Sequence, residues 1–278
     1  MNRKNIYFFI AAALCLLACA TIGVPNTYGL FYTPLAQRLD TGRASVTLHV
    51  SIAGLVTGFS SPLIVRAMKK IPYRLIIIGG IAMITISGFV IATSKSLLLI
   101  NIMGLLRGLG LACSSNVIIT MVTGNWFKSR RGTISGLVMS FSGIMGALYS
   151  PILSSLLSEK GFSFSYLFCI FLIILLSLPA MILPFKPQDI GMEAYETKKE
   201  EHKEKDSYEG RFPLRVTALP FVTIVFISLL VICMTTLTSY LPGYAQSLGH
   251  EAKAAAALLS SSMIGNVLFK FLIGLSID

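Results

Sequence analysis

The sequence predicts an all-α membrane protein, a bundle of helices that cross a lipid bilayer. Hydrophobic residues make up 54% of the 278 residues and charged residues 13%, whereas a soluble domain carries about a quarter charged residues. Apolar residues also gather in eight stretches close to the roughly 20 residues that a helix needs to cross the hydrocarbon core. The alternating strands of a membrane barrel are absent from the sequence. Composition and pattern therefore both indicate a helical bundle.

The eight predicted helices follow one another through the whole chain. The first begins with "MNRKN" and "IYFFIAAALCLLAC", which is similar to a lipoprotein signal peptide. A cleaved secretory protein would continue as a soluble domain. Here further membrane-length stretches follow, so the first helix is predicted to be retained. The predicted helices cover residues 6–30, 46–65, 75–93, 97–120, 133–157, 164–183, 219–241 and 254–275.

The basic residues predict the orientation of the chain, because lysine and arginine gather on the cytoplasmic side of membrane proteins. With the N-terminus in the cytoplasm, the inside segments hold 16 of these residues and the outside segments 5. We therefore expect a multi-pass protein of the cell membrane with a cytoplasmic N-terminus. Since the membrane accounts for the basic clusters, the net charge of +11 predicts no nucleic-acid partner.

The longest polar stretch, residues 186–211, divides the chain. It holds eight of the twelve acidic residues and mixes lysine with glutamate too evenly to form an apolar helix face, which is typical of a mobile linker. We therefore expect a six-helix N-terminal bundle over residues 1–185, a cytoplasmic linker over 186–216, and two further helices over 217–278.

The sequence predicts no metal site, cofactor or enzymatic activity. Its five cysteines lie in apolar stretches without a CxxC pair or a neighbouring histidine, as expected of small buried side chains. The apolar stretches hold no aspartate or glutamate, and an HExxH motif is also absent from the sequence. The expected partner is the lipid bilayer.

Five segments of the chain together suggest a known family. They are "NTYGLFYTPLAQRL", "GLLRGLGLACSSN", "NWFKSRRGTISG", "PQDIGMEAYE" and "SYLPGYAQSLGHEAKAAAALLSSSMIGNVLFKFLIGLSID". They resemble the major facilitator superfamily, most closely its oxalate:formate antiporter and monocarboxylate porter branches, and the likeness spans nearly the whole chain. The sequence departs from the family in the loop between the second and third helices, where Lys69 stands at the family's aspartate.

The resemblance implies a major facilitator-type helical bundle acting as a secondary transporter, in which two bundles rock around a central site. Family members have twelve helices, so we expect a complete first six-helix bundle plus two helices of a C-terminally truncated second bundle. The implied substrate is a small organic solute, with an anion such as a carboxylate favoured. The sequence does not determine the oligomeric state, for which a monomer is favoured. A drug or metabolite exporter of the same fold and a non-transporting membrane remnant stay open as alternatives.

Four residues are candidates for substrate binding. Arg107 lies roughly 15 Å into the fourth helix at 1.5 Å per residue, and it either anchors an anion or bonds to groups of the protein. Lys270 resembles a family residue that faces carboxylate substrates; the alternative is a lysine that reaches the headgroups. Asn26 and Tyr28 lie in a glycine- and proline-broken part of the first helix, where they bind substrate or satisfy loosened backbone. His49 either takes up protons or is structural.

The fifth predicted helix carries a face of small residues. Such a face lets helix backbones approach closely, and a proline permits a bend. The face is therefore either a gating surface or an ordinary packing surface, with Gly136, Gly143 and Pro151 as its candidate residues. Trp126, just before this helix, is predicted at headgroup level. The small residues are Gly132, Gly136, Ser140, Gly143, Ala147 and Pro151.

Overall fold

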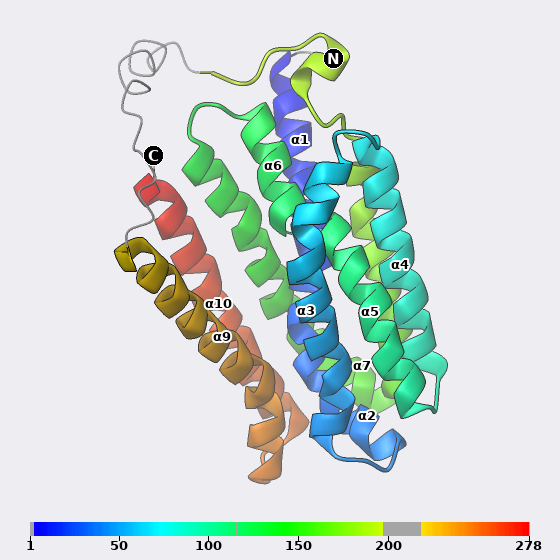
Figure 1. Cartoon of the computed structure of the whole chain (residues 1–278). Coiled ribbons are helices and arrows are strands. Elements are labelled where there is room, and N and C mark those ends of the chain that lie inside the picture. Colours follow the sequence, from blue (N-terminus) through cyan, green and yellow to red (C-terminus); the bar gives the residue numbers. More distant parts are fainter. Residues whose placement is uncertain (1–2, 115, 197–217, 278) are drawn as a thin grey trace.

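The structure is a computed structural model that describes residues 3–114, 116–196 and 218–277. These residues form a bundle of helices that run roughly along one direction (Figure 1), which confirms the all-α prediction. The helices are α1 (Arg3–Ala18), the π-helical η1 (Cys19–Gly23), the 3-10 helix η2 (Pro25–Phe31), α2 (Tyr32–Arg38), α3 (Arg43–Ala67), α4 (Tyr73–Thr93), α5 (Leu97–Ser114), α6 (Asn116–Trp126), α7 (Arg131–Ile182), η3 (Pro187–Ile190), α9 (Ala218–Ser247) and α10 (Ala252–Ile277).

Helix α7 accounts for two of the eight predicted crossings. Seven helical spans in the described ranges are long and apolar enough to cross a membrane, and one of them is the 52-residue α7. At 1.5 Å per residue α7 would be roughly 78 Å long, more than twice the roughly 30 Å hydrocarbon core. It is not straight, because Gly161 has φ 77° and ψ 179°, a conformation that favours glycine. The chain turns back there, and two membrane-length limbs result.

The first crossing is broken, as its glycines and proline predict. The span Asn5–Arg38 passes from α1 through η1 and η2 into α2. Pro25 has no backbone N–H to donate, and the Val24 N–H bonds to the Cys19 carbonyl five residues back at 2.9 Å. The Thr27 hydroxyl donates to the Val24 carbonyl at 2.7 Å. Local side chains and wider turns thus satisfy the loosened backbone.

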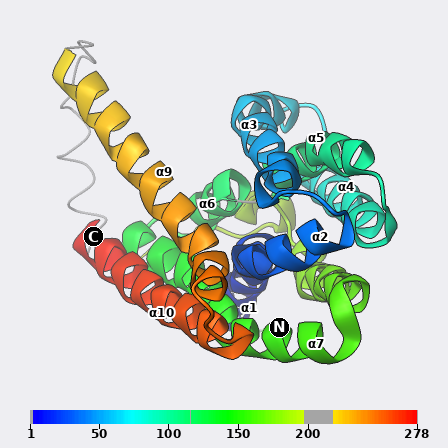
Figure 2. The same ribbon diagram turned by 90° about the horizontal axis from the view of Figure 1, so that it is seen from below.

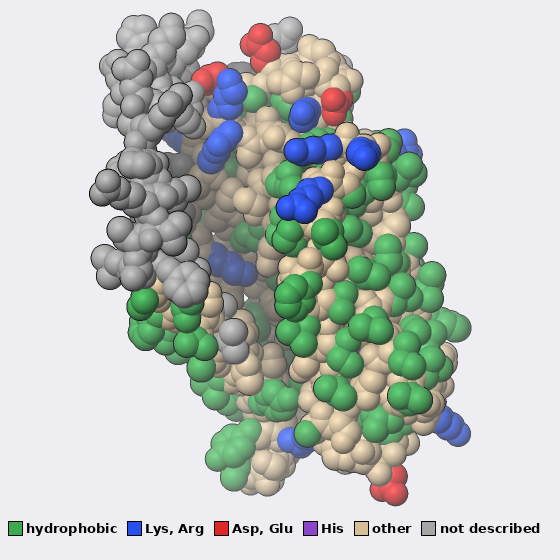
Figure 3. Space-filling model, in the orientation of Figure 1, with side chains coloured by type: hydrophobic (Ala, Val, Ile, Leu, Met, Phe, Trp, Pro, Cys, Tyr) green, Lys and Arg blue, Asp and Glu red, His purple; other side chains and the backbone are tan. Residues whose placement is uncertain are grey.

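The core lies among the helices from α1 to α7, and the outer faces are apolar. Leu14, Ile77 and Leu153 are fully buried, whereas Phe59 is 78% exposed and Leu148 67%. Figure 3 shows hydrophobic side chains over the flank of the bundle and basic side chains gathered at one end. Large exposed hydrophobic side chains would be costly in water, so this flank is the face that contacts lipid.

Helices α9 and α10 pack on one side of this core (Figures 1 and 2). Helix α10 lies along the first limb of α7, and these two helices share the most extensive contact between elements in the described part of the chain. Helix α9 touches η2 and α10. Helix α9 meets the core at the end of the bundle opposite the start of α1. Toward the end where α1 starts, α9 diverges from the core.

The first part of the predicted linker is ordered against the bundle. The Tyr195 N–H donates to the Trp126 carbonyl at 2.8 Å, and the Lys128 N–H donates to the Tyr195 carbonyl at 3.0 Å. Trp126 is fully buried and its Nε1 donates to the Pro184 carbonyl at 3.1 Å, so its ring packs inside the protein at this end of the bundle. The rest of the predicted linker, residues 197–216, lies outside the described residues.

Candidate functional site

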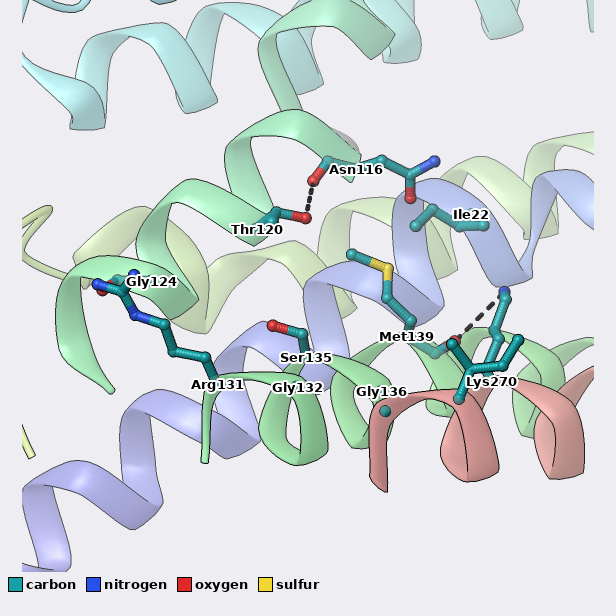
Figure 4. A pocket seen from close by; sticks show the side chains of 12 residues that line it. Ile22, Asn116, Thr120, Gly124, Arg131, Gly132, Ser135, Gly136, Met139 and Lys270 are labelled. Atoms are coloured by element: carbon teal, nitrogen blue, oxygen red, sulfur yellow. Dashed lines mark hydrogen bonds between the residues drawn. The ribbon is translucent and has the colours of Figure 1, made fainter. Parts of the chain in front are cut away.

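A cavity of about 740 Å³ lies between α10 and the core helices. Its walls come from η1, α6, the first turns of α7, and α10 (Figure 4). One lining residue, Arg131, lies at the start of α7. The cavity is therefore at the end of the bundle where the lysines and arginines gather. The lining residues are Ile22, Asn116, Thr120, Gly124, Arg131, Gly132, Ser135, Gly136, Met139, Lys270, Ile273 and Gly274.

Lys270 places a positive charge in the wall of this cavity. The side chain is half-buried, and its Nζ donates to the Ser142 hydroxyl at 3.0 Å and to the Met139 carbonyl at 3.5 Å. It therefore points across to α7 and not along α10 toward the headgroups. The ion pair Lys128–Glu196 is the one present among the described residues, so Lys270 has neutral partners there.

The back of the cavity is the crossing of α7 and α10, where the small-residue face of α7 lies. A Cβ added to Gly136 would stand 2.8 Å from the Gly274 Cα and 2.8 Å from the Lys270 carbonyl oxygen. A Cβ added to Gly143 would stand 2.7 Å from the Val267 side chain and 3.0 Å from the Met263 carbonyl oxygen. Pro151, in contrast, is exposed, and among the described residues of α7 only Gly161 departs from helical φ/ψ. The face is therefore a close helix–helix contact, and Pro151 lies outside it.

Contacts between α9 and the core gather at the opposite end of the molecule. Arg43, at the start of α3, donates from Nη1 to the Gly243 carbonyl at 2.7 Å. The Tyr240 hydroxyl donates to Thr47 at 3.0 Å, and Gly29 lies directly against the Ser239 carbonyl. The core and the α9–α10 pair are thus joined at this end, and the cavity lies at the other.

Arg107 does not line the cavity. It is 5% exposed, its Nη1 donates to the Tyr166 hydroxyl at 3.2 Å, and its guanidinium carbon lies 4.3 Å from the centre of the Tyr28 ring. The Tyr28 and Tyr166 rings stack with centres 5.4 Å apart. A cation over an aromatic face is stabilised by the ring's negative face, so aromatic groups take the place of an acidic partner.

The other predicted polar residues also lie outside the cavity lining. Tyr28 is 5% exposed in the Arg107 cluster, and Asn26 is half-buried in η2. His49 is 3% exposed and its Nδ1 bonds to the Val46 carbonyl, which supports its structural alternative. Of the seven residues predicted to bind substrate or to gate, Lys270 and Gly136 are therefore brought together at the cavity, whereas Arg107, Asn26, Tyr28, Gly143 and Pro151 are not.

Sequence reasoning missed the polar residues opposite Lys270. Asn116 and Thr120 reach the cavity from α6, and Figure 4 shows Asn116 across the space from the α10 wall. The sequence signal for them was weak, since isolated polar residues in an apolar helix are common. Together the lining offers the Lys270 ammonium, the Arg131 guanidinium, amide and hydroxyl groups, and apolar walls, which suits a small anionic molecule with an apolar part.

A sequence profile of the Major Facilitator Superfamily matches residues 4–278. The chain belongs to the Major Facilitator Superfamily. Comparison with solved structures shows that this major facilitator chain also has the family's fold. It matches a crystal structure of a D-xylose–proton symporter with a TM-score of 0.66 at 14% identity, covering 100% of this chain and 70% of the other.

The curated relatives of the chain include three transporters. Human monocarboxylate transporter 7 is 22% identical over 60% of this chain, and the oxalate:formate antiporter of Oxalobacter formigenes is 26% identical over 66%. The MFS-type transporter pynF of Aspergillus niger is 25% identical over 93%. The matches span 34%, 44% and 58% of those relatives' own lengths, so this major facilitator chain corresponds to about half of such a protein.

Proposed function

We propose that this protein is a secondary transporter that moves a small organic anion, with carboxylates favoured. The observation that carries the proposal is Lys270, whose ammonium lies in the cavity wall on neutral partners. A charged side chain inside a membrane is costly unless it is paired or faces a water-filled cavity. A substrate carboxylate would supply the missing negative charge. The names of two relatives, a monocarboxylate transporter and an oxalate:formate antiporter, point to the same class of substrate.

Alternating access is the proposed mechanism, and the position of the cavity supports it. The contacts of α9 with α3 and η2 close one end, while the cavity lies at the basic end. We infer that rocking the α9–α10 side about the α7–α10 crossing opens the closed end and closes the other. Small residues at the crossing allow such movement because the backbones meet without side chains between them.

We propose different roles for the two buried cations. Lys270 binds the anion, whereas Arg107 holds the Tyr28–Tyr166 aromatic cluster together. An anion at Arg107 would first have to displace the Tyr166 hydroxyl and open a side chain that is 5% exposed. Asn26 and Tyr28 then contribute to the shape of the first helix, and direct contact with substrate falls to the lining residues.

Uptake by reconstituted protein tests the function. The chain is placed in proteoliposomes, and uptake of radiolabelled formate, acetate and oxalate is compared with uptake of the cation ethidium. We expect saturable uptake or exchange of at least one carboxylate and none of ethidium. If no carboxylate is transported, carboxylate-induced thermal stabilisation of the purified chain is measured. Absence of both responses would support the non-transporting remnant, and ethidium transport would support the exporter; either result overturns the proposal.

The proposed orientation predicts which residues can be labelled from outside the cell. Lys95 and Lys69 are both exposed in loops at opposite ends of the bundle, and Cys233 is the exposed native cysteine. On a Cys233→Ser background, Lys95→Cys should react with a membrane-impermeant maleimide in intact cells, and Lys69→Cys should react only after lysis. The opposite pattern would place the N-terminus outside.

A further inference from the structure

A second hollow of about 540 Å³ lies at the basic end of the bundle. Two stretches far apart in sequence form it: the end of α6 with the loop into α7, and the segment that follows α7. Three cationic side chains line it, namely Lys128, Arg131 and Lys186. The remaining lining residues are Gly124, Asn125, Gln188, Asp189 and Ala194.

The hollow is built by hydrogen bonds and not by a loose loop. Backbone bonds join Tyr195 to Trp126 at 2.8 Å and to Lys128 at 3.0 Å. Asn125 Nδ2 donates to the Phe185 carbonyl at 3.3 Å. The Arg131 guanidinium donates from Nε to the Phe127 carbonyl at 3.2 Å and from Nη2 to the Gly124 carbonyl at 3.0 Å. The Arg131 guanidinium is therefore held in place, and Lys128 and Lys186 line the same space.

The acids near the hollow neutralise these cations only in part. Asp189 uses its carboxylate to accept the Lys186 backbone N–H at 2.9 Å, which closes the turn of η3. Glu196 pairs with Lys128 at 3.5 Å, with side-chain exposures of 32% and 50%, and exposed pairs of this kind are weak. The positive end of the α7 dipole points to the same place. The hollow thus favours an anion.

We propose that this hollow binds the phosphate of an anionic phospholipid headgroup, held by Lys128, Arg131 and Lys186. It lies at the basic end of the membrane helices, which is the level of the headgroups of one leaflet. Basic pockets at this level recognise anionic lipids through the phosphate. A bound headgroup would also hold the segment after α7 on the bundle. Because Gly124 and Arg131 line both this hollow and the cavity, lipid binding would stabilise the conformation described here.

Lipid binding to the purified chain tests this site without reference to transport. Thermal stability in detergent is measured with phosphatidylglycerol, with phosphatidylcholine and with inorganic phosphate, and bound lipid is counted by native mass spectrometry. The test variant is Lys128→Gln with Lys186→Gln, which leaves Arg131 in place. The matched control is Lys69→Gln with Lys70→Gln, two exposed lysines at the same end but outside the hollow.

We expect phosphatidylglycerol to stabilise the wild type and the control pair more than phosphatidylcholine does. Removing two charges should weaken its binding roughly 30-fold in the test variant, whose melting temperature without lipid should match the wild type. Equal binding to the test variant and the control pair would overturn the site. Stabilisation by inorganic phosphate alone, equal to that by phosphatidylglycerol, would overturn the lipid assignment in favour of a free phosphate anion.

Discussion

Lys270→Gln should weaken carboxylate binding by roughly 10- to 150-fold, because a hydrogen bond to a charged group contributes about 1.5–3 kcal/mol. Glutamine is one bond shorter than lysine but keeps a polar group beside the Ser142 hydroxyl, a present partner of Nζ, and leaves no charge to bury. The fold is therefore expected to survive. Lys270→Arg keeps the charge but changes its shape, so it should weaken binding less. The affinity of the carboxylate, measured per folded molecule, is the deciding quantity.

Two further variants separate this binding role from general effects. Lys253→Gln removes an exposed charge near the other end of α10 and should leave affinity unchanged. Arg107→Gln removes the guanidinium from Tyr166 and Tyr28 and should lower the folded yield, while the surviving protein binds carboxylate normally. If Arg107→Gln instead lost affinity at normal yield, and Lys270→Gln did not, the assignment of the two cations would be reversed.

Gly136→Leu should destabilise the fold by about 1–3 kcal/mol or more, the usual cost of inserting atoms into a packed contact. The new Cβ would stand 2.8 Å from two backbone atoms of α10, at Gly274 and Lys270. Backbone cannot swing aside as the end of a flexible side chain can, so α10 has to move away from α7. Because Lys270 is on the displaced helix, carboxylate binding should fall as well. Thermal melting in detergent, monitored by size exclusion, measures the first effect.

The controls for this variant lie on the same two helices. The first control, Gly265→Leu, is on α10, where an added Cβ meets nothing within 4 Å. In a helix, leucine is more favourable than glycine by about 1 kcal/mol or slightly less. This variant should be neutral or slightly stabilising. Gly143→Leu meets the Val267 side chain at 2.7 Å and should fall between the two. Equal melting temperatures for all three would show that the α7–α10 crossing is not close-packed.

Much of the fold follows from the sequence, because a bilayer imposes simple rules on a chain. An apolar stretch that crosses the hydrocarbon has to satisfy its backbone within itself, so length and hydropathy identify helices directly. The break in the first crossing was predictable for a similar local reason, since Pro25 lacks an N–H. The turn at Gly161 was predictable as a boundary between two apolar stretches, although its φ of 77° was not.

Whether a polar residue faces a cavity was decided by tertiary structure. Arg107 and Lys270 have the same appearance in sequence, each a lone cation in an apolar helix, yet one is enclosed by tyrosines and the other lines a cavity. The difference depends on which helix packs on which face. Tyr28 and Tyr166 are 138 residues apart in the chain and stack at 5.4 Å, a contact that no local pattern encodes.

The sequence by itself determined the helical class, the position of the crossings, the charge asymmetry between the two ends and the small-residue face of α7. These are properties of single segments meeting water or lipid, so local composition suffices to set them. Only the tertiary structure decided that this face meets α10, that Lys270 bonds to Ser142 across that contact, and that Tyr195 closes over Trp126. Each of these contacts depends on shape complementarity between segments more than 60 residues apart in the sequence. The free energy of such a contact depends on both segments together, so the sequence of either segment alone does not determine it.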